Sequence, residues 1–171
     1  ELLNFFLFEL RKFKKNLKVY TADMLPDLSA ASYISKNSIQ LPEANNRNFI
    51  KRLMFVSKKN RISYIIPTID TELNVLSKNK KKFLREKIHI ICSDYELIKM
   101  LRDKRNLTLI SKKFRVNIPK IYTSSNVSYP CFAKPYDGSN SKNTFIINNK
   151  NEMKISKKNK KIFFSQYLNS S

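Results

Sequence analysis

The sequence predicts an α/β protein, with a Rossmann-like domain built on a mostly parallel sheet and then part of an α+β subdomain. Short apolar segments alternate with amphipathic helical patterns up to about residue 101, which favours parallel strands covered by helices on both faces. From Ile118 onward the pattern changes to short strands separated by turns rich in Asn and Lys. The 171 residues, 42% of them hydrophobic, can bury the core of one domain or of two small ones.

The elements of the first part follow from the period of the apolar side chains. A stripe with spacings of three and four predicts an amphipathic helix at the start of the chain, formed by Leu3, Phe6, Leu10, Phe13 and Leu17. A short strand is expected over residues 18–22, ending at Asp23, with a loop around Pro26 after it. Helices are expected over residues 46–60 and 70–86, strands over 62–67 and 88–92, and a helix capped by Ser93 after them.

The second part is expected to begin near residues 100 to 104. A periodic segment from Lys104 to about Val116 predicts a helix. Strands are expected over residues 129–134, 144–147 and 162–166.

The net charge of +21, from 34 basic and 13 acidic residues, raises the possibility of nucleic-acid binding. The lysines are spread over predicted helix surfaces and turns, which favours a solvated surface over a focused binding face. Cys92 and Cys131 each lie in an apolar segment and are interpreted as buried thiols in a reducing compartment, so a cytoplasmic location is expected. His89 is interpreted as a strand residue without a chemical role.

Three carboxylates follow the carboxyl ends of predicted strands, where open parallel sheets place their functional crevice. Asp23, Asp70 and Glu72 are therefore candidate substrate-binding residues. The alternative for each is ordinary turn chemistry or a helix cap.

The clearest functional signal surrounds Gly138, the only glycine in the chain. Ser139 and Ser141 follow it, and Lys134 and Lys142 lie on either side, so amides, hydroxyls and ammonium groups are expected to converge as a polyphosphate site requires. Lys104 opens a predicted helix 30 positions before Lys134, and a helix amino terminus favours an anion.

Taken in order, several blocks of sequence resemble the branch of the ATP-grasp superfamily that includes the large chain of carbamoyl phosphate synthase. The blocks are residues 65–73, 90–93 with the helix to Lys104, 114–119, 130–142 and 163–168. The resemblance implies a pre-ATP-grasp domain at residues 1–101, lacking its first strand, and the amino-terminal part of an ATP-grasp domain at residues 102–171.

The resemblance also implies roles for particular residues. Lys104 and Lys134 correspond to the two family lysines that contact the phosphates of ATP, and the loop that closes over them is implied to contain Asp137, Gly138, Ser139, Asn140, Ser141 and Lys142. Gln166, Tyr167 and Leu168 correspond to the hinge whose backbone faces the adenine edge.

The reaction implied by the resemblance is activation of a small-molecule carboxylate as an acylphosphate with Mg-ATP, followed by attack of an amine or similar nucleophile. The Mg²⁺ ligands are expected outside residues 1–171, the catalytic residues stay unassigned, and the 171 residues alone are expected to be inactive. Asn140 and Asn143 stand where many relatives have residues without a side chain, so a noncatalytic pseudo-ligase is one alternative. A basic module that binds nucleic acid or an anionic surface is the other.

Overall fold

The computed structural model describes residues 2–13, 17–123, 126–138, 141, 143–156 and 161–168. The chain forms two compact units, Glu1–Cys92 and Ser93–Ser171. The assignment of domains to residues 1–101 and 102–171 stays a prediction. Each unit is described by itself below.

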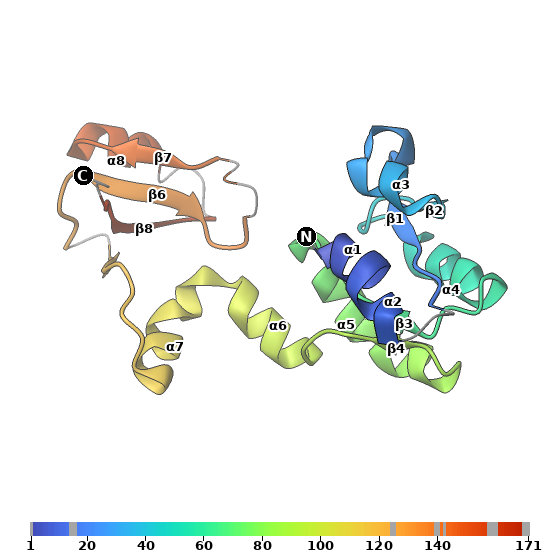
Figure 1. The fold of residues 1–171 in the computed structure, drawn as a ribbon. Coiled ribbons are helices and arrows are strands. Elements are labelled where there is room, and N and C mark those ends of the chain that lie inside the picture. The colour runs from blue at the N-terminus through green and yellow to red at the C-terminus, as the bar shows by residue number, and fades with distance from the viewer. Residues whose placement is uncertain are drawn as a thin grey trace. The chain divides into compact units, whose positions relative to one another are not determined.

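The first unit opens with a helical segment and then alternates strands with helices (Figure 1). The opening segment is α1 (Leu2–Asn4), a π-helical turn (Phe5–Glu9) and α2 (Leu10–Phe13). After it come β1 (Thr21–Asp23), a 3₁₀ turn (Pro26–Leu28), α3 (Ala30–Ser35), β2 (Ser38–Gln40), α4 (Phe49–Lys59), β3 (Tyr64–Ile65), α5 (Asp70–Arg85) and β4 (His89–Ile90).

The opening helix was predicted, but its apolar stripe is shorter than expected. Leu7 is buried and Leu3, Phe6 and Leu10 are half-buried, whereas the side chain of Phe13 is 89% exposed. Leu17 lies outside any helix, so its place on the stripe was wrong.

The strands of this unit pair in parallel, as the alternating pattern predicted. β1 pairs with β2 from Thr21 opposite Ser38 to Asp23 opposite Gln40, and β3 pairs with β4. A parallel pair needs a crossover connection, and helices supply both: α3 joins β1 to β2, and α5 joins β3 to β4. The predicted fold class is confirmed.

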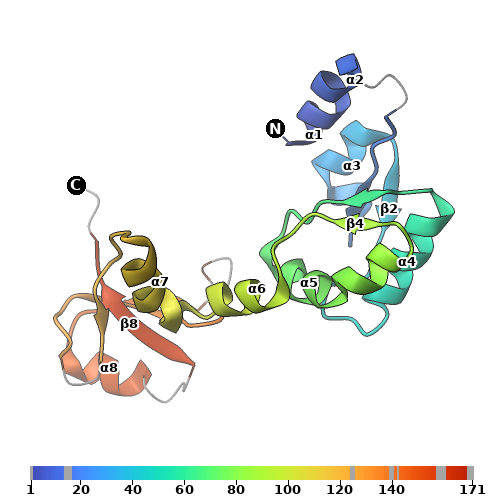
Figure 2. The same cartoon turned by 90° about the horizontal axis from the view of Figure 1, so that it is seen from below.

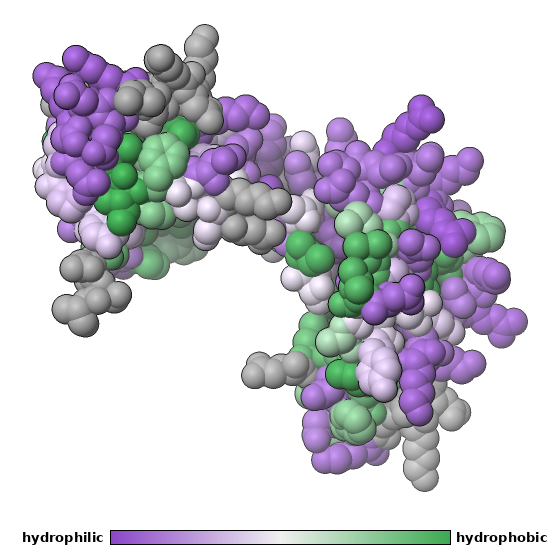
Figure 3. Space-filling model, turned by 90° about the horizontal axis from the view of Figure 1, so that it is seen from above, coloured by the Kyte–Doolittle hydropathy of each residue, from purple (hydrophilic) through white to green (hydrophobic). Residues whose placement is uncertain are grey.

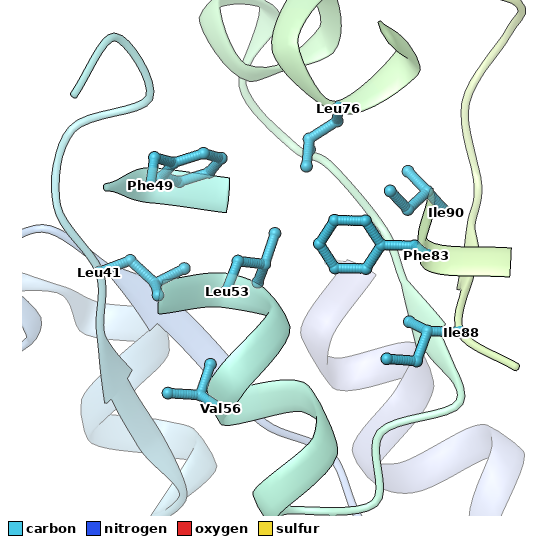
Figure 4. Packing of buried hydrophobic residues seen from close by; sticks show 8 residues of the cluster. All are labelled: Leu41, Phe49, Leu53, Val56, Leu76, Phe83, Ile88 and Ile90. Atoms are coloured by element: carbon cyan, nitrogen blue, oxygen red, sulfur yellow. The ribbon is translucent and has the colours of Figure 1, made fainter. Parts of the chain in front are cut away.

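The core of the first unit lies among α4, α5 and β4. α4 and α5 contact each other and lie side by side (Figure 2). Their inward-facing side chains meet those around β4 (Figure 4), and the fully buried members of this cluster are Leu41, Phe49, Leu53, Val56, Leu76, Phe83, Ile88 and Ile90. Phe83 has no exposed surface. The apolar face of each helix, seen in the sequence as pairs four apart, is the face that builds this core.

α3 and β2 were not predicted from the sequence, and α3 buries serines instead of an apolar stripe. Ser32 and Ser35 are 6% and 5% exposed. The hydroxyl of Thr21 on β1 lies 2.7 Å from the hydroxyl of Ser35 and donates to that of Ser32 at 3.5 Å. Ser29 caps the helix by accepting from the Ser32 N–H. A hydrogen-bonded interface of this kind leaves no hydrophobic period in the sequence.

The second unit carries a four-stranded antiparallel sheet with the strand order β5-β8-β6-β7. Its elements are α6 (Tyr95–Arg102), a 3₁₀ turn (Lys104–Asn106), α7 (Leu107–Phe114), β5 (Ile121–Tyr122), β6 (Cys131–Pro135), β7 (Phe145–Ile147), α8 (Lys150–Ser156) and β8 (Ile162–Gln166). The strands β6, β7 and β8 were predicted, whereas β5 and α8 were not. The N-cap of α6 is Asp94, one residue after the predicted Ser93. Met153 of α8 packs on the sheet with Cys131, Ala133, Ile147 and Phe164.

Hydrophilic side chains cover most of the visible surface of each unit, with apolar patches between them (Figure 3). Cys131 is buried, as expected, and forms no disulfide, whereas Cys92 is half-buried. No helix in the described part of the chain is long and apolar enough to cross a bilayer.

Candidate functional site

The start of the 3₁₀ turn and the loop after β6 are joined through Lys104. The backbone N–H of Lys104 donates to the carbonyl of Tyr136 at 2.8 Å. Its side-chain Nζ donates to the carbonyl of Gly138. Two residues that lie 34 positions apart in the sequence are thereby brought into contact, as the sequence predicted.

Lys134 lies on β6, opposite Phe163 on β8. Its Nζ is 5.2 Å from the centre of the Phe163 ring and 5.7 Å from that of Phe132, so the ammonium group is held between aromatic rings. Partial burial lowers the pKa of Lys134, and the positive charge of Lys104 lowers it further. The two predicted phosphate-contacting lysines are therefore close enough to repel one another.

Neither lysine has a compensating carboxylate. Within the described residues, no ion pair involves Lys104 or Lys134. Two like charges in a partly buried place are costly unless an anion lies between them. The local electrostatics thus favour a bound anion, and polyphosphate is an anion with enough charge to interact with both groups.

The backbone of Gly138 lies close to the ring of Pro135, which leaves little room for a side chain. A Cβ atom at this position would lie 3.0 Å from Pro135 Cβ and 3.2 Å from its Cγ. The φ angle of Gly138 is not positive, so the left-handed region does not explain the glycine. Left-handed angles occur further along the loop instead, at Ser141 (φ 53°) and Asn143 (φ 57°).

The rest of the predicted phosphate loop is only partly described. Ser139, Asn140 and Lys142 lie outside the described residues. Ser141 accepts through its carbonyl from the Thr144 hydroxyl at 2.9 Å. The carboxylate of Asp137 lies 3.7 Å from the Lys161 ammonium group, next to the start of β8. Contact of these loop residues with ATP stays a prediction.

A cation–π contact, which the sequence analysis missed, fixes the same loop. The guanidinium carbon of Arg105 lies 3.9 Å from the centre of the Tyr136 ring. Asp103 also binds the guanidinium, accepting from Nε at 2.9 Å and from a terminal nitrogen at 2.5 Å. The side-chain hydrogen bond from Arg105 also lowers the pKa of Asp103. The only signal in the sequence was the Asp-Lys-Arg triplet, which does not show which ring Arg105 would meet.

The predicted adenine hinge follows the end of β8. Gln166 is the last residue of the strand, and its N–H donates to the Lys120 carbonyl at 2.7 Å. Its side-chain oxygen accepts from the Lys120 N–H at 3.3 Å. Gln166 thus fastens β8 to the segment before β5, and Tyr167 and Leu168 extend beyond the sheet. Their contact with adenine stays a prediction.

Two of the three candidate substrate-binding carboxylates are brought together in the first unit. Asp23 ends β1, and Glu72 lies in the first turn of α5, where burial raises its pKa and the negative charge of Asp23 raises it further. Asp23 also accepts from the Leu25 N–H at 2.9 Å, which is the ordinary turn role named as its alternative. Asp70 is the first residue of α5. Over the described ranges, no three His, Cys, Asp or Glu side chains are grouped to hold a metal ion.

A parallel-stranded α/β unit is followed by a unit in which the two predicted phosphate-contacting lysines lie near each other beside a hydroxyl-containing loop. A family model described as PylC-like, N-terminal domain, matches residues 2–91, about half of the chain. The chain belongs to this PylC-like family. The predicted resemblance to the ATP-grasp superfamily is confirmed.

Solved structures with the same fold include three ligase or carboxylase proteins. The biotin carboxylase domain of 2-oxoglutarate carboxylase from Hydrogenobacter thermophilus, in complex with MgADP and bicarbonate, has a TM-score of 0.69 at 11% identity, over 94% of this chain and 41% of that one. The L-amino acid ligase from Bacillus licheniformis gives 0.66 at 15% identity, over 95% and 41%. The N5-carboxyaminoimidazole ribonucleotide synthetase from Thermotoga maritima gives 0.60 at 16% identity, over 95% and 43%.

The chain therefore spans about two fifths of the length of these structures. No curated protein sequence matches it significantly.

Proposed function

We propose that this chain is the ATP-binding portion of a ligase that activates a carboxylate for attack by an amine or similar nucleophile. The observation that carries the proposal is the convergence of Lys104, Lys134 and Gly138 in a chain of the PylC-like family. Because neither lysine is paired with a carboxylate within the described residues, the site is suited to an anion.

Each residue has a defined task in this proposal. Lys104 and Lys134 neutralise phosphate charge, and the Gly138 loop supplies backbone amides that a side chain would obstruct. Tyr167 and Leu168 would present backbone groups to the adenine edge. ATP supplies the phosphoryl group when it is bound. As the family resemblance implies, we propose that the Mg²⁺ ligands lie outside residues 1–171, and we assign the metal no step here.

The carboxylate substrate is proposed to bind near the strand ends of the first unit. Asp23 and Glu72 lie close together there, and they suit a cationic or hydroxyl-bearing part of the substrate or acceptor better than its carboxylate, because like charges repel. We further propose a cytoplasmic location, based on the buried Cys131, which forms no disulfide. The 171 residues alone are proposed to bind ATP weakly and not to turn it over.

Isothermal titration with Mg-ATP tests the proposal, in this chain and in a version extended at its carboxyl end to the length of the compared structures. In the extended protein, Lys134→Ala should weaken ATP binding about ten- to a hundredfold, because a charge-assisted phosphate contact contributes about 1.5–3 kcal/mol. Lys112→Ala is the matched control, since Lys112 is an exposed lysine on α7. Equal affinities for the Lys134 and Lys112 variants, or no binding by the extended protein, would refute the assignment.

A further inference from the structure

A hollow of about 410 Å³ lies within the first unit, between β2 and α4. It is separate in sequence from the Lys104 and Lys134 site, because all of its lining residues fall between Tyr20 and Asn60. Its volume is in the range of small-molecule sites, which hold about 300–1,000 Å³. The lining side chains that carry charge or an aromatic ring are Tyr20, Lys36, Arg52, Phe55 and Lys59.

The charge of this hollow is entirely positive. Lys36, Arg52 and Lys59 line it, and no Asp or Glu does. Among the described residues, none of these three cations forms an ion pair with a carboxylate. Lys58, the neighbour of Lys59 in α4, does not line the hollow and is paired with Glu86 at 2.8 Å. Within the described residues, Arg52 and Lys59 are thus two cations of α4 that line the hollow and form no ion pair.

An exposed aromatic ring lies among these cations. The side chain of Phe55 is 56% exposed, on a helix that buries Leu53 and Val56. The Arg52 guanidinium carbon lies 5.7 Å from the centre of the Phe55 ring. Arg52, Phe55 and Lys59 recur at spacings of three and four, so one face of α4 presents cation, ring and cation in a row.

Hydrogen bonds to the backbone hold the frame of the hollow. The Asn37 side chain donates to the Val19 carbonyl at 3.2 Å, and the Asn60 side chain donates to the Val56 carbonyl at 2.8 Å. Lys36 occupies the C-cap of α3 with a left-handed φ of 58°, which turns the chain into β2 at the rim. A frame fixed in this way loses little conformational freedom when a ligand binds.

We propose that this hollow binds a small molecule in which a planar ring is joined to a phosphate group, a ligand of the nucleoside monophosphate class. The cations match a dianionic phosphate, and the Phe55 ring with the Arg52 guanidinium offers a stacking surface for a base. A lone phosphate would leave most of the volume and the aromatic ring without a contact.

The test is a titration followed by amide NMR of the whole 171-residue chain, which shows where each probe binds. The probes are uridine 5′-monophosphate, ribose 5-phosphate as the match without a base, and uridine as the match without a phosphate. The expected result is saturable shifts at residues 36–40 and 52–60 with uridine 5′-monophosphate, at a Kd of about 0.1–1 mM. Each partial probe is expected to bind about tenfold more weakly.

Two double variants of equal charge separate a site from general basicity. Arg52→Gln with Lys59→Gln should weaken binding of uridine 5′-monophosphate at least about tenfold. Lys51→Gln with Lys78→Gln removes the same charge from exposed positions outside the hollow and should leave binding unchanged. Phe55→Leu should weaken uridine 5′-monophosphate but not ribose 5-phosphate, and the dispersion of each spectrum checks that the variant is folded.

Three outcomes would overturn the proposal. The first is the absence of saturable shifts at the hollow up to about 10 mM ligand. The second is equal weakening by the two double variants, which would show attraction to net charge alone. The third is affinity that keeps rising with each nucleotide added to an oligouridylate, which would indicate an extended nucleic-acid surface.

Discussion

The lowered pKa of Lys134 leads to a prediction about proton uptake when an anion binds. Its pKa is lowered by burial and by Lys104, so folding with a charged Lys134 is costly at neutral pH. A phosphate placed between the two ammonium groups would raise the pKa of Lys134 again, because it favours the charged form. Binding of ATP should therefore be accompanied by proton uptake at any pH where free Lys134 is partly neutral. The repulsion between Lys104 and Lys134 that destabilises the folded unit thus also favours the binding of an anion.

Glu72 gives a prediction of opposite sign for stability against pH. Burial and Asp23 raise its pKa above the ordinary value of 4.5. Its charged form therefore destabilises the folded state above the raised pKa, and this penalty disappears as pH falls toward 4.5. Glu72→Gln should increase the free energy of unfolding at pH 7, and the gain should vanish at pH 4. Urea denaturation at both pH values measures this; a gain that is equal at both would contradict it.

At the scale of elements, Arg105 and Tyr136 connect the 3₁₀ turn before α7 with the loop after β6. The cation–π contact is solvent-exposed and therefore weak, so Arg105→Ala should weaken ATP binding only about two- to fivefold by loosening the loop that contains Gly138. Arg105→Lys keeps the charge but loses the planar fork that Asp103 holds, so it should show much of the same loss. Full affinity in Arg105→Lys would mean that Arg105 acts only through its charge.

α5 packs against α4 in the core of the first unit. Phe83 is fully buried between them and the segment around β4. Phe83→Ala should lower the free energy of unfolding by about 3–5 kcal/mol, because it leaves a cavity that the rigid helices cannot fill. Circular dichroism in urea measures this loss, with Leu84→Ala as the control, since Leu84 is 53% exposed. Equal losses in the two variants would contradict the assignment of the core.

The same elements show which parts of the fold the sequence reveals. α5 was predicted within one residue because its apolar face is periodic and Asp70 opens its first turn. α3 was missed because it packs on β1 through serine and threonine hydroxyls, and β2 was missed because it is only three residues long. At the site, the meeting of Lys104 and Gly138 followed from the motif, whereas the Arg105 and Tyr136 contact depends on tertiary geometry between segments far apart in the sequence. Hydrophobic periodicity and turn residues can be recognised within one short segment of sequence. Stacking of side chains from distant segments cannot, because it depends on the tertiary fold.

At the scale of the whole chain, basic residues stand at helix ends where many proteins have glycine. Four basic residues adopt left-handed backbone angles: Lys36 after α3, Arg61 after α4, Lys87 after α5 and Arg115 after α7. Helices commonly end on glycine in this conformation because it has no Cβ to clash. A cation there gains from the helix dipole, but the backbone conformation costs about 1–2 kcal/mol.

Replacing the residues at these helix ends by glycine should increase the stability of the protein. Lys87→Gly should raise the free energy of unfolding by about 0.5–1 kcal/mol, because Lys87 is exposed and the relief of backbone strain exceeds the lost dipole contact and the greater freedom of the unfolded chain. Lys81→Gly, within α5, is the opposite control and should destabilise by about 1 kcal/mol. A thermal melt that ranks the two variants in reverse would contradict this reading. Each replacement by glycine also removes a positive charge. Glycine at all four helix ends should therefore give a protein that is more stable and binds polyanions less during purification.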